Sequence, residues 1–183
     1  MDDTTATTQV LDAAEELFYS RGIQAVGMDD IRTRSQVSLK RLYRLFASKD
    51  DLVAAYLDQR DTRWIGRLEA HVAAVREPKA RILAVFDWLA EWFSEPDFQG
   101  CAFINSFGEL GRISPRVAAV ARGHKRRFRV FVTGLTEAAG LPAETADQLV
   151  LLAEGAMVVA GMDPGPAPAH QARRAAEILI AAH

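Results

Sequence analysis

The sequence predicts an all-α protein of about nine helices. Apolar residues recur at spacings of three and four along nearly all of its 183 residues, and an alternating β-branched pattern is missing. Proline and glycine interrupt this pattern at positions where helices are expected to begin or end. The hydrophobic content of 49% and the near balance of 22 Lys and Arg with 24 Asp and Glu exclude collagen, coiled-coil rods and intrinsic disorder.

The N-terminal third is expected to hold four helices. The first runs from Thr5 to Arg21, with threonines near its start able to cap it and Gly22 as its stop. Those that follow are Met28 to Ser35, Leu39 to Phe46, and a long helix that opens at Ser48 and continues to about Val75. Ser48 is a suitable N-cap for the long helix, and the acidic residues after it suit the positive end of a helix.

Five further helices are expected after Pro78, which breaks the pattern. The first carries the apolar stripe from Ile82 to Phe93, and a shorter one carries Phe103, Phe107 and Leu110. The remaining three are Pro115 to about Ala139, Pro142 to about Ala160, and a last helix that follows the loop Gly161 to Pro168 and ends near His183. We expect a small unit, residues 1–47, and a larger helical unit, residues 48–183.

The composition also indicates where the protein is located in the cell and which disulfides, metals and cofactors it can hold. The longest stretch without a charged residue, Phe98 to Gly108, has 11 residues, whereas a membrane-spanning helix needs about 20. The acidic start of the chain has no secretory signal, so we expect a cytoplasmic protein with no membrane partner. The single cysteine, Cys101, and four scattered histidines predict no disulfide, no metal site and no cofactor. A buried, inert Cys101 is favoured over a redox sensor because no resolving cysteine exists.

Residues 28–46 have the spacing of a helix-turn-helix, two short helices around a tight turn. The residues expected to pack inward are Ile31, Val37, Leu42 and Phe46, together with Leu17 and Phe18 of the first helix. Ser38 is expected to cap the second short helix. Residues 28–49 contain six basic and two acidic residues, a net charge of +4, and the rest of the chain carries −6. A short basic helix suits the DNA major groove.

The block LYRLFASKDDLVAAYL, residues 42–57, resembles the L-Y-x-x-F-x-S-K-x-x-L signature of the TetR family of bacterial transcriptional repressors. The resemblance covers roughly residues 8 to 57 and includes the preceding AAEELFYSRGIQAVGMDDI. It implies a helix-turn-helix DNA-binding domain followed by a helical ligand-binding and dimerisation domain. Four positions depart from the family pattern: Gly27 replaces a capping Ser or Thr, Gln36 replaces a turn glycine, and Lys40-Arg41 replaces a Gly-Thr pair. We infer an altered operator preference and weaker local stability.

By position, the resemblance implies phosphate contacts for Tyr43 and Lys49. Base or phosphate contacts are implied for the exposed face of the second short helix. The full predicted set is Arg32, Ser38, Leu39, Lys40, Arg41, Tyr43, Arg44 and Lys49. For a single isolated helix, a core tyrosine and a solvated basic face would be the simpler interpretation; the combined motif favours DNA contact.

The larger unit carries aromatic residues at helical spacing, which is typical of a core and also of a ligand pocket between helices. In TetR-like proteins this region holds an inducer pocket, and the segment Gly100 to Leu110 is similar to that of the LmrA/YxaF-like subgroup. The predicted pocket residues are Trp88, Trp92, Phe103, Asn105, Phe107, Glu109, Phe128, Phe131 and Met157. Asn105 and Glu109 are the possible polar anchors, and they can equally bond to each other or cap a neighbouring helix.

The last two helices carry small and apolar residues that allow close approach. In the TetR family the equivalent helices form a four-helix dimer interface, and the residues expected there are Leu149, Leu152, Ala156, Val159, Ala172, Ala176 and Leu179. Alternatively, these residues complete the core of one protomer. Two-fold symmetry would match a palindromic operator on double-stranded DNA.

The sequence therefore predicts a homodimeric repressor that a small apolar or aromatic effector releases from its operator. Two other classes of protein are compatible with the same helical pattern. The first, an all-α enzyme, is disfavoured because the sequence has no paired catalytic carboxylates, no Ser-His-Asp order and no phosphate loop. A small-molecule-binding or interaction module that does not bind an operator would share the same helices.

Overall fold

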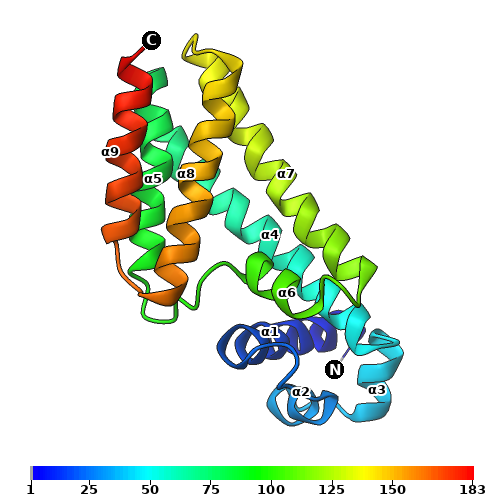
Figure 1. The fold of residues 1–183 in the computed structure, drawn as a ribbon. Coiled ribbons are helices and arrows are strands. Elements are labelled where there is room, and N and C mark those ends of the chain that lie inside the picture. Colours follow the sequence, from blue (N-terminus) through cyan, green and yellow to red (C-terminus); the bar gives the residue numbers. More distant parts are fainter. Residues whose placement is uncertain (1) are drawn as a thin grey trace. The chain divides into compact units, whose positions relative to one another are not determined.

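A computed structural model of the chain describes residues 2–183, and in that range it has nine α-helices and no strand (Figure 1). The all-α prediction is confirmed. The helices are α1 (Asp3–Arg21), α2 (Met28–Ser35), α3 (Leu39–Leu45), α4 (Lys49–Ala73), α5 (Pro78–Phe93), α6 (Ala102–Leu110), α7 (Pro115–Ala138), α8 (Ala143–Met162) and α9 (Ala167–Ala181).

The chain divides into two compact units. The first unit comprises the residues up to Thr62 and the segment Ala102–Arg122, and the second comprises Arg63–Cys101 and Gly123–His183. Helices α4 and α7 each contribute residues to both units. The compact unit that holds α1 to α3 thus extends past residue 47 and includes α6; the functional division at residue 47 stays a prediction.

The core of the first unit forms where α1 packs against α2 and α3. The buried residues are those the sequence assigned to it, Phe18, Ile31, Val37, Leu42 and Phe46, whereas Leu17 is only half-buried. Full burial of one such side chain contributes about 1.5–3 kcal/mol. This contribution matters because α2 and α3 have only eight and seven residues, and helices that short are not stable alone in water.

Side-chain caps set most of the helix starts in the first unit. Helix α1 begins at Asp3, two residues before the predicted start, because the Asp2 carboxylate accepts a hydrogen bond of 2.7 Å from the Thr5 N–H. The expectation that a threonine caps this helix is therefore wrong. Gly22, with φ of 84°, ends α1 as predicted. Ser38 caps α3, and the Ser48 hydroxyl accepts from the Asp51 N–H at 3.1 Å at the start of α4, both as predicted.

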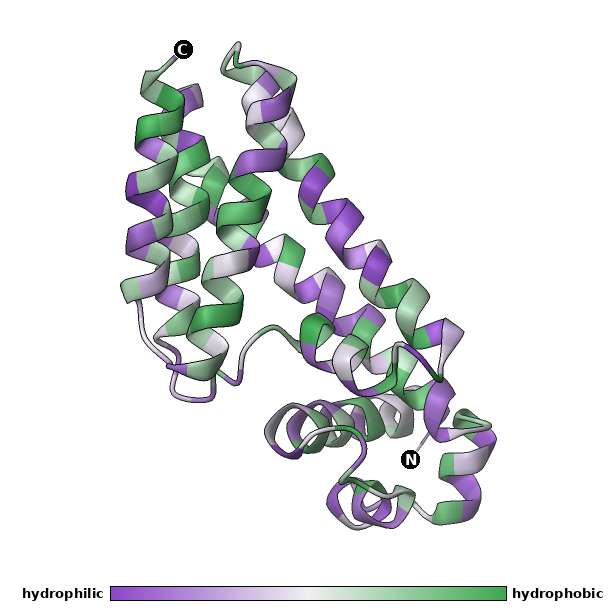
Figure 2. Ribbon diagram, in the orientation of Figure 1, coloured by the Kyte–Doolittle hydropathy of each residue, from purple (hydrophilic) through white to green (hydrophobic). Residues whose placement is uncertain are grey.

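In the second unit α5, α8 and α9 lie side by side (Figure 1). Helix α5 begins at Pro78, four residues before the predicted stripe, since proline suits the first helical turn and the Glu77 carboxylate accepts from the N–H groups of Lys79 and Ala80. Figure 2 shows hydrophobic residues along much of α5 and α8. The buried side chains of α5 include Ile82, Phe86 and Phe93.

Among the described residues, α8 is the one helix long and apolar enough to cross a membrane by length and composition. Core helices of folded proteins meet the same criteria. Two contacts favour a core helix: Asp147 pairs with Arg129 at 2.7 Å, and Glu154 pairs with Lys125 at 2.6 Å. Helix α8 also packs on α9 and α5, so it belongs to the helical bundle of the second unit.

Candidate nucleic-acid interface

The turn between α2 and α3 is built around one left-handed residue. Gln36 has φ of 57° and ψ of 19°, and it is the one non-glycine residue among residues 2–183 with positive φ. The next residue, Val37, is buried, and its N–H donates to the Ser35 hydroxyl at 3.3 Å. This conformation explains why glycine is common at this position of the motif, because glycine adopts it without steric cost.

The start of α2 uses one half of a capping box. Gly27 has no side chain that can accept a hydrogen bond, but its N–H donates to the Asp30 carboxylate at 2.7 Å. This backbone bond lowers the pKa of Asp30 below its usual value, and the nearby Arg21 guanidinium, 3.6 Å away, adds to the effect. Asp30 therefore supplies the half of the capping box that needs no side chain at residue 27, and the bond that a serine or threonine would make there is missing.

The outward face of α3 is polar, basic and accessible. Leu42 is fully buried on the inner side, whereas Lys40, Tyr43 and Arg44 lie on the outer side. Tyr43 is 46% exposed and the Arg44 side chain is 63% exposed. The structure thus excludes the interpretation of Tyr43 as a core aromatic. Guanidinium, ammonium and phenol groups on one face supply hydrogen-bond donors for phosphate and base edges.

The surface beside the start of α3 is hollowed. A depression of about 450 Å³ is lined by Arg32, Thr33, Gln36, Val37 and Ser38, so two predicted DNA contacts, Arg32 and Ser38, share it. Arg32 also bonds to Asp29 one turn earlier in α2, at 3.1 Å. Leu39, which follows Ser38, is half-buried.

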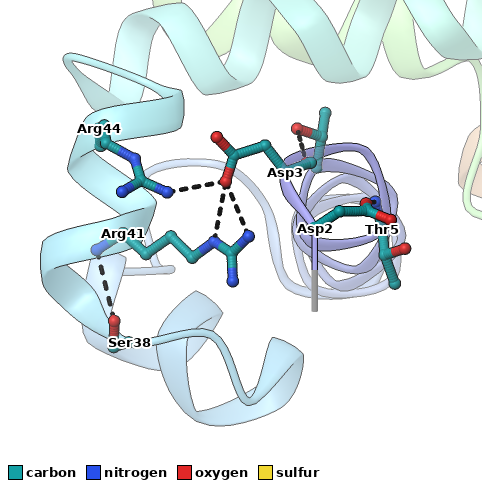
Figure 3. A network of polar contacts seen from close by, with 7 residues as sticks. Asp2, Asp3, Thr5, Ser38, Arg41 and Arg44 are labelled. Atoms are coloured by element: carbon teal, nitrogen blue, oxygen red, sulfur yellow. Dashed lines mark hydrogen bonds and ion pairs between the residues drawn. The ribbon is translucent and has the colours of Figure 1, made fainter.

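Two predicted DNA contacts, Arg41 and Arg44, are held by one carboxylate of α1 (Figure 3). Arg41 donates from Nε and Nη2 to Asp3 Oδ1 at 3.1 and 2.7 Å, and Arg44 donates from Nη2 to the same oxygen at 2.7 Å. The hydrogen bond from Arg41 lowers the pKa of Asp3 below its usual range, and Arg44 adds to this effect.

Lys49 lies differently from the other predicted contacts. Its Nζ donates to the Ile23 carbonyl at 2.6 Å and lies 5.9 Å from the centre of the Phe18 ring. Burial lowers the pKa of this ammonium group, although the carboxylates of Glu109 and Asp30 oppose the shift. In this arrangement Lys49 ties the start of α4 to the segment after α1, and its phosphate contact stays a prediction.

Comparison with known proteins places this helix-turn-helix in a family. Residues 10–56 match the profile of the bacterial regulatory proteins, tetR family. An HTH-type transcriptional regulator of Mycobacterium tuberculosis is 32% identical over 194 residues, covering 91% of this chain and 90% of the relative. The chain belongs to the TetR family of transcriptional regulators.

Two further proteins extend the similarity beyond the helix-turn-helix. The crystal structure of a TetR-family transcriptional regulator from Streptomyces coelicolor has 29% sequence identity, a TM-score of 0.89, and coverage of 97% of this chain and 95% of its own. An HTH-type transcriptional repressor of M. tuberculosis is 31% identical over 156 residues, 78% of this chain and 81% of its own. Regulators of this family bind DNA and are not enzymes, so the alternative of an all-α enzyme is excluded.

The predicted pocket residues of this TetR-family protein fall into different units. Phe103, Asn105, Phe107 and Glu109 belong to the first unit, and Trp88, Trp92, Phe128, Phe131 and Met157 belong to the second. In the second unit the rings of Trp88, Trp92 and Phe128 surround Trp64, with centroids 4.9, 5.6 and 5.6 Å from it. Met157 is buried, and Phe131 is half-buried. An aromatic cluster therefore exists there, packed ring against ring.

In the first unit, Phe103 is buried, whereas Asn105 and Phe107 are exposed. Glu109 binds backbone groups in the segment that follows α1, and it caps neither α1 nor α2. Its carboxylate oxygens accept from the N–H groups of Ile23 and Gln24 at 3.1 and 2.8 Å. The Gln24 side chain donates in turn to the Glu109 carbonyl at 3.1 Å. These bonds fasten the segment between α1 and α2 to α6.

Most of the residues predicted at the dimer interface are buried within one protomer. Leu149, Ala156, Ala172 and Ala176 are buried, Leu152 and Leu179 are half-buried, and Val159 is exposed. Besides Val159, the accessible large apolar side chains of these helices are ones the sequence did not select: Leu151, Val158 and Met162 of α8 and Ile178 of α9. Helices α8 and α9 pack on each other, so these buried residues lie within the protomer, and the dimer interface stays a prediction.

Sequence reasoning missed Asp3, Trp64 and most of this exposed apolar set. Asp3 gives no local signal, because its partners lie 38 and 41 residues away. Trp64 falls on the long helix from Ser48, where its apolar spacing was a usable signal. Four of the five exposed apolar residues lie on α8, which is apolar on several sides, so periodicity alone does not select the outward one.

The positive φ of Gln36 predicts that a substitution at this position changes the stability of the protein. Gln36→Gly is expected to raise the free energy of unfolding by about 0.5–1 kcal/mol, because glycine adopts positive φ without steric cost. The greater conformational entropy of glycine in the unfolded chain offsets part of this gain. Urea unfolding followed by circular dichroism measures this. Gln36→Ala keeps a β-carbon and should give no gain; equal stabilisation by alanine and glycine would contradict the conformation described.

Proposed function

We propose that this TetR-family regulator is a homodimeric, cytoplasmic repressor that binds a palindromic operator and leaves it when a small apolar or aromatic effector binds. The observation that carries the DNA-binding part is the face of α3, where Lys40, Tyr43 and Arg44 lie opposite the buried Leu42. The repressor direction is supported by the M. tuberculosis relative whose name describes a transcriptional repressor.

In the proposed complex, α3 enters the major groove and α2 lies across its edge. Arg44 and Lys40 are assigned to base edges, where a bidentate contact to guanine contributes about 1–3 kcal/mol of discrimination. Tyr43 is assigned to a phosphate through its hydroxyl group. Phosphate contacts fix the register of the helix, and base contacts select the sequence.

The exposed apolar side chains of α8 and α9 are proposed to form the dimer interface. Leu151, Met162 and Ile178 are each more than 70% exposed, which is unusual for large apolar residues on two adjacent helices. Burying them against a second copy around a two-fold axis gives an isologous interface. Two recognition helices related by that axis match two half-sites of a palindrome.

The effector is proposed to bind among the aromatic residues of the second unit. Because Trp64, Trp88, Trp92 and Phe128 pack against one another, a ligand needs a conformer in which this cluster opens. A ligand that binds that conformer more tightly shifts the population toward it, and linkage then weakens operator binding by the same factor. Helices α4 and α7 are the continuous elements with residues in both units.

The division of DNA contacts can be tested with two substitutions. Arg44→Ala is expected to relax the preference at one operator position by about 1–3 kcal/mol, because a base contact is lost. Tyr43→Phe keeps the ring and loses the hydroxyl, so affinity should fall by a similar factor for all sequences. Selection of bound genomic fragments followed by bandshift assays measures both effects. A wild-type protein without sequence preference at moderate salt would refute the operator, and identical patterns in both variants would refute the assignment of roles.

The dimer interface can be tested with a charge on α9. Ile178→Glu is expected to convert the dimer into monomers and to abolish operator binding, because a carboxylate would be buried in an apolar interface. Sedimentation equilibrium measures the mass. Ile113→Glu is the matched control, since Ile113 is 73% exposed and Ile178 is 72% exposed. A wild-type mass for the Ile178 variant would place the interface elsewhere.

The effector site can be tested through tryptophan emission, because all three tryptophans of the chain lie in the one cluster. A compound recovered from the purified protein by mass spectrometry should change the emission and release operator DNA over the same concentration range. Free tryptophan amide controls for absorption by the compound. Operator release without any change of emission would place the effector outside this cluster.

A further inference from the structure

Asp3 holds the two arginines of the recognition helix through a single oxygen atom. Figure 3 shows Oδ1 of Asp3, at the start of α1, facing both guanidinium groups of α3. Three N–H donors converge on it: two from Arg41 at 3.1 and 2.7 Å and one from Arg44 at 2.7 Å. The fork of Arg41 is thus engaged by Asp3 on two of its nitrogens.

These ion pairs are accessible to a competing anion. The side chains of Asp3 and Arg44 are 59% and 63% exposed, and that of Arg41 is 21% exposed. Exposed ion pairs contribute only about 0.2–1 kcal/mol each and are screened by salt. A DNA phosphate offers the same kind of anionic oxygen acceptor to a guanidinium group as a carboxylate does, so it can compete for the arginines.

Asp3 is not needed as the helix cap, because its neighbour Asp2 fills that role. The Asp2 carboxylate accepts from the Thr5 N–H at 2.7 Å, whereas Oδ1 of Asp3 is directed to α3. Both carboxylates also suit the positive end of the α1 dipole. The charge of Arg41 acts on both acids, but only Asp3 accepts hydrogen bonds from the arginines, which separates the effect of charge from that of pairing.

We propose that Asp3 is a specificity-determining residue, an internal counter-ion that competes with DNA phosphates for Arg41 and Arg44. A non-specific duplex offers these arginines only phosphates, and each phosphate contact must first replace the carboxylate. An operator also offers base edges, which are uncharged acceptors and can share a guanidinium fork with the carboxylate, whereas a charged phosphate repels it. Asp3 thereby lowers non-specific affinity more than operator affinity.

This inference rests on DNA binding by α3 and makes its own prediction. Asp3→Asn is expected to bind a mixed-sequence, non-operator duplex about three- to tenfold more tightly, with a salt slope steeper by about one to two. Its affinity for the selected operator fragment should rise less, so the ratio of specific to non-specific affinity falls. Fluorescence anisotropy with labelled duplexes over about 50–200 mM KCl measures all of these quantities.

Two variants serve as controls. Asp2→Asn removes the same formal charge one residue away and keeps an N-cap, since asparagine caps as well as aspartate; its non-specific affinity should change by less than about twofold. Asp3→Glu keeps a carboxylate and should restore wild-type behaviour. Circular dichroism of each variant establishes that α1 is folded.

The outcomes that overturn the proposal are distinct. Equal affinities for the Asp3→Asn and Asp2→Asn variants on the non-operator duplex would reduce Asp3 to one more surface charge. Weaker DNA binding by Asp3→Asn would make Asp3 a residue that positions the arginines for DNA. If the wild type shows no operator preference, the proposed operator fails, while the comparison of the two variants on the non-operator duplex still decides the role of Asp3.

Discussion

The DNA-reading surface depends on the burial of a few apolar side chains between α1, α2 and α3. Helix α3 has only seven residues, too few for a stable helix in water, and its fully buried Leu42 joins Ile31 and Phe18 in the core. This burial gives the short helix its stability. It also determines its orientation, because a helix with Leu42 inside must present Tyr43 and Arg44 outside.

The connections around this core use charged side chains on backbone groups. Asp30 accepts from the Gly27 N–H, Glu109 accepts from the N–H groups of Ile23 and Gln24, and Lys49 donates to the Ile23 carbonyl. Each bond satisfies a backbone group in or next to the segment that joins α1 to α2. Glu109 and Lys49 come from α6 and α4, so helices outside the helix-turn-helix hold its entry segment in place. A change in α6 or α4 would therefore reach the DNA-reading element.

Many of the basic side chains around the helix-turn-helix are paired with carboxylates. Residues 28–49 carry +4, but several of these cations already face carboxylates: Arg34 with Glu16, Arg32 with Asp29, and Arg41 and Arg44 with Asp3. The field that a distant phosphate meets is thus weaker than the basic count suggests. If the proposal for Asp3 holds, these cations attract DNA fully only after its phosphates replace the carboxylates.

The sequence by itself determined the helices, most of their ends and the helix-turn-helix. Gly22, Ser38 and Ser48 act where local chemistry predicts, because caps and left-handed stops depend on residues within one turn. The tertiary structure alone decided the pairing of Asp3 with the arginines, the binding of Glu109 to the backbone between α1 and α2, and the outward position of Leu151 and Ile178. These features join residues far apart in the chain, or select one side of a helix that is apolar on several sides. Periodicity defines a helix and its faces, but only packing against particular neighbours determines which face is covered.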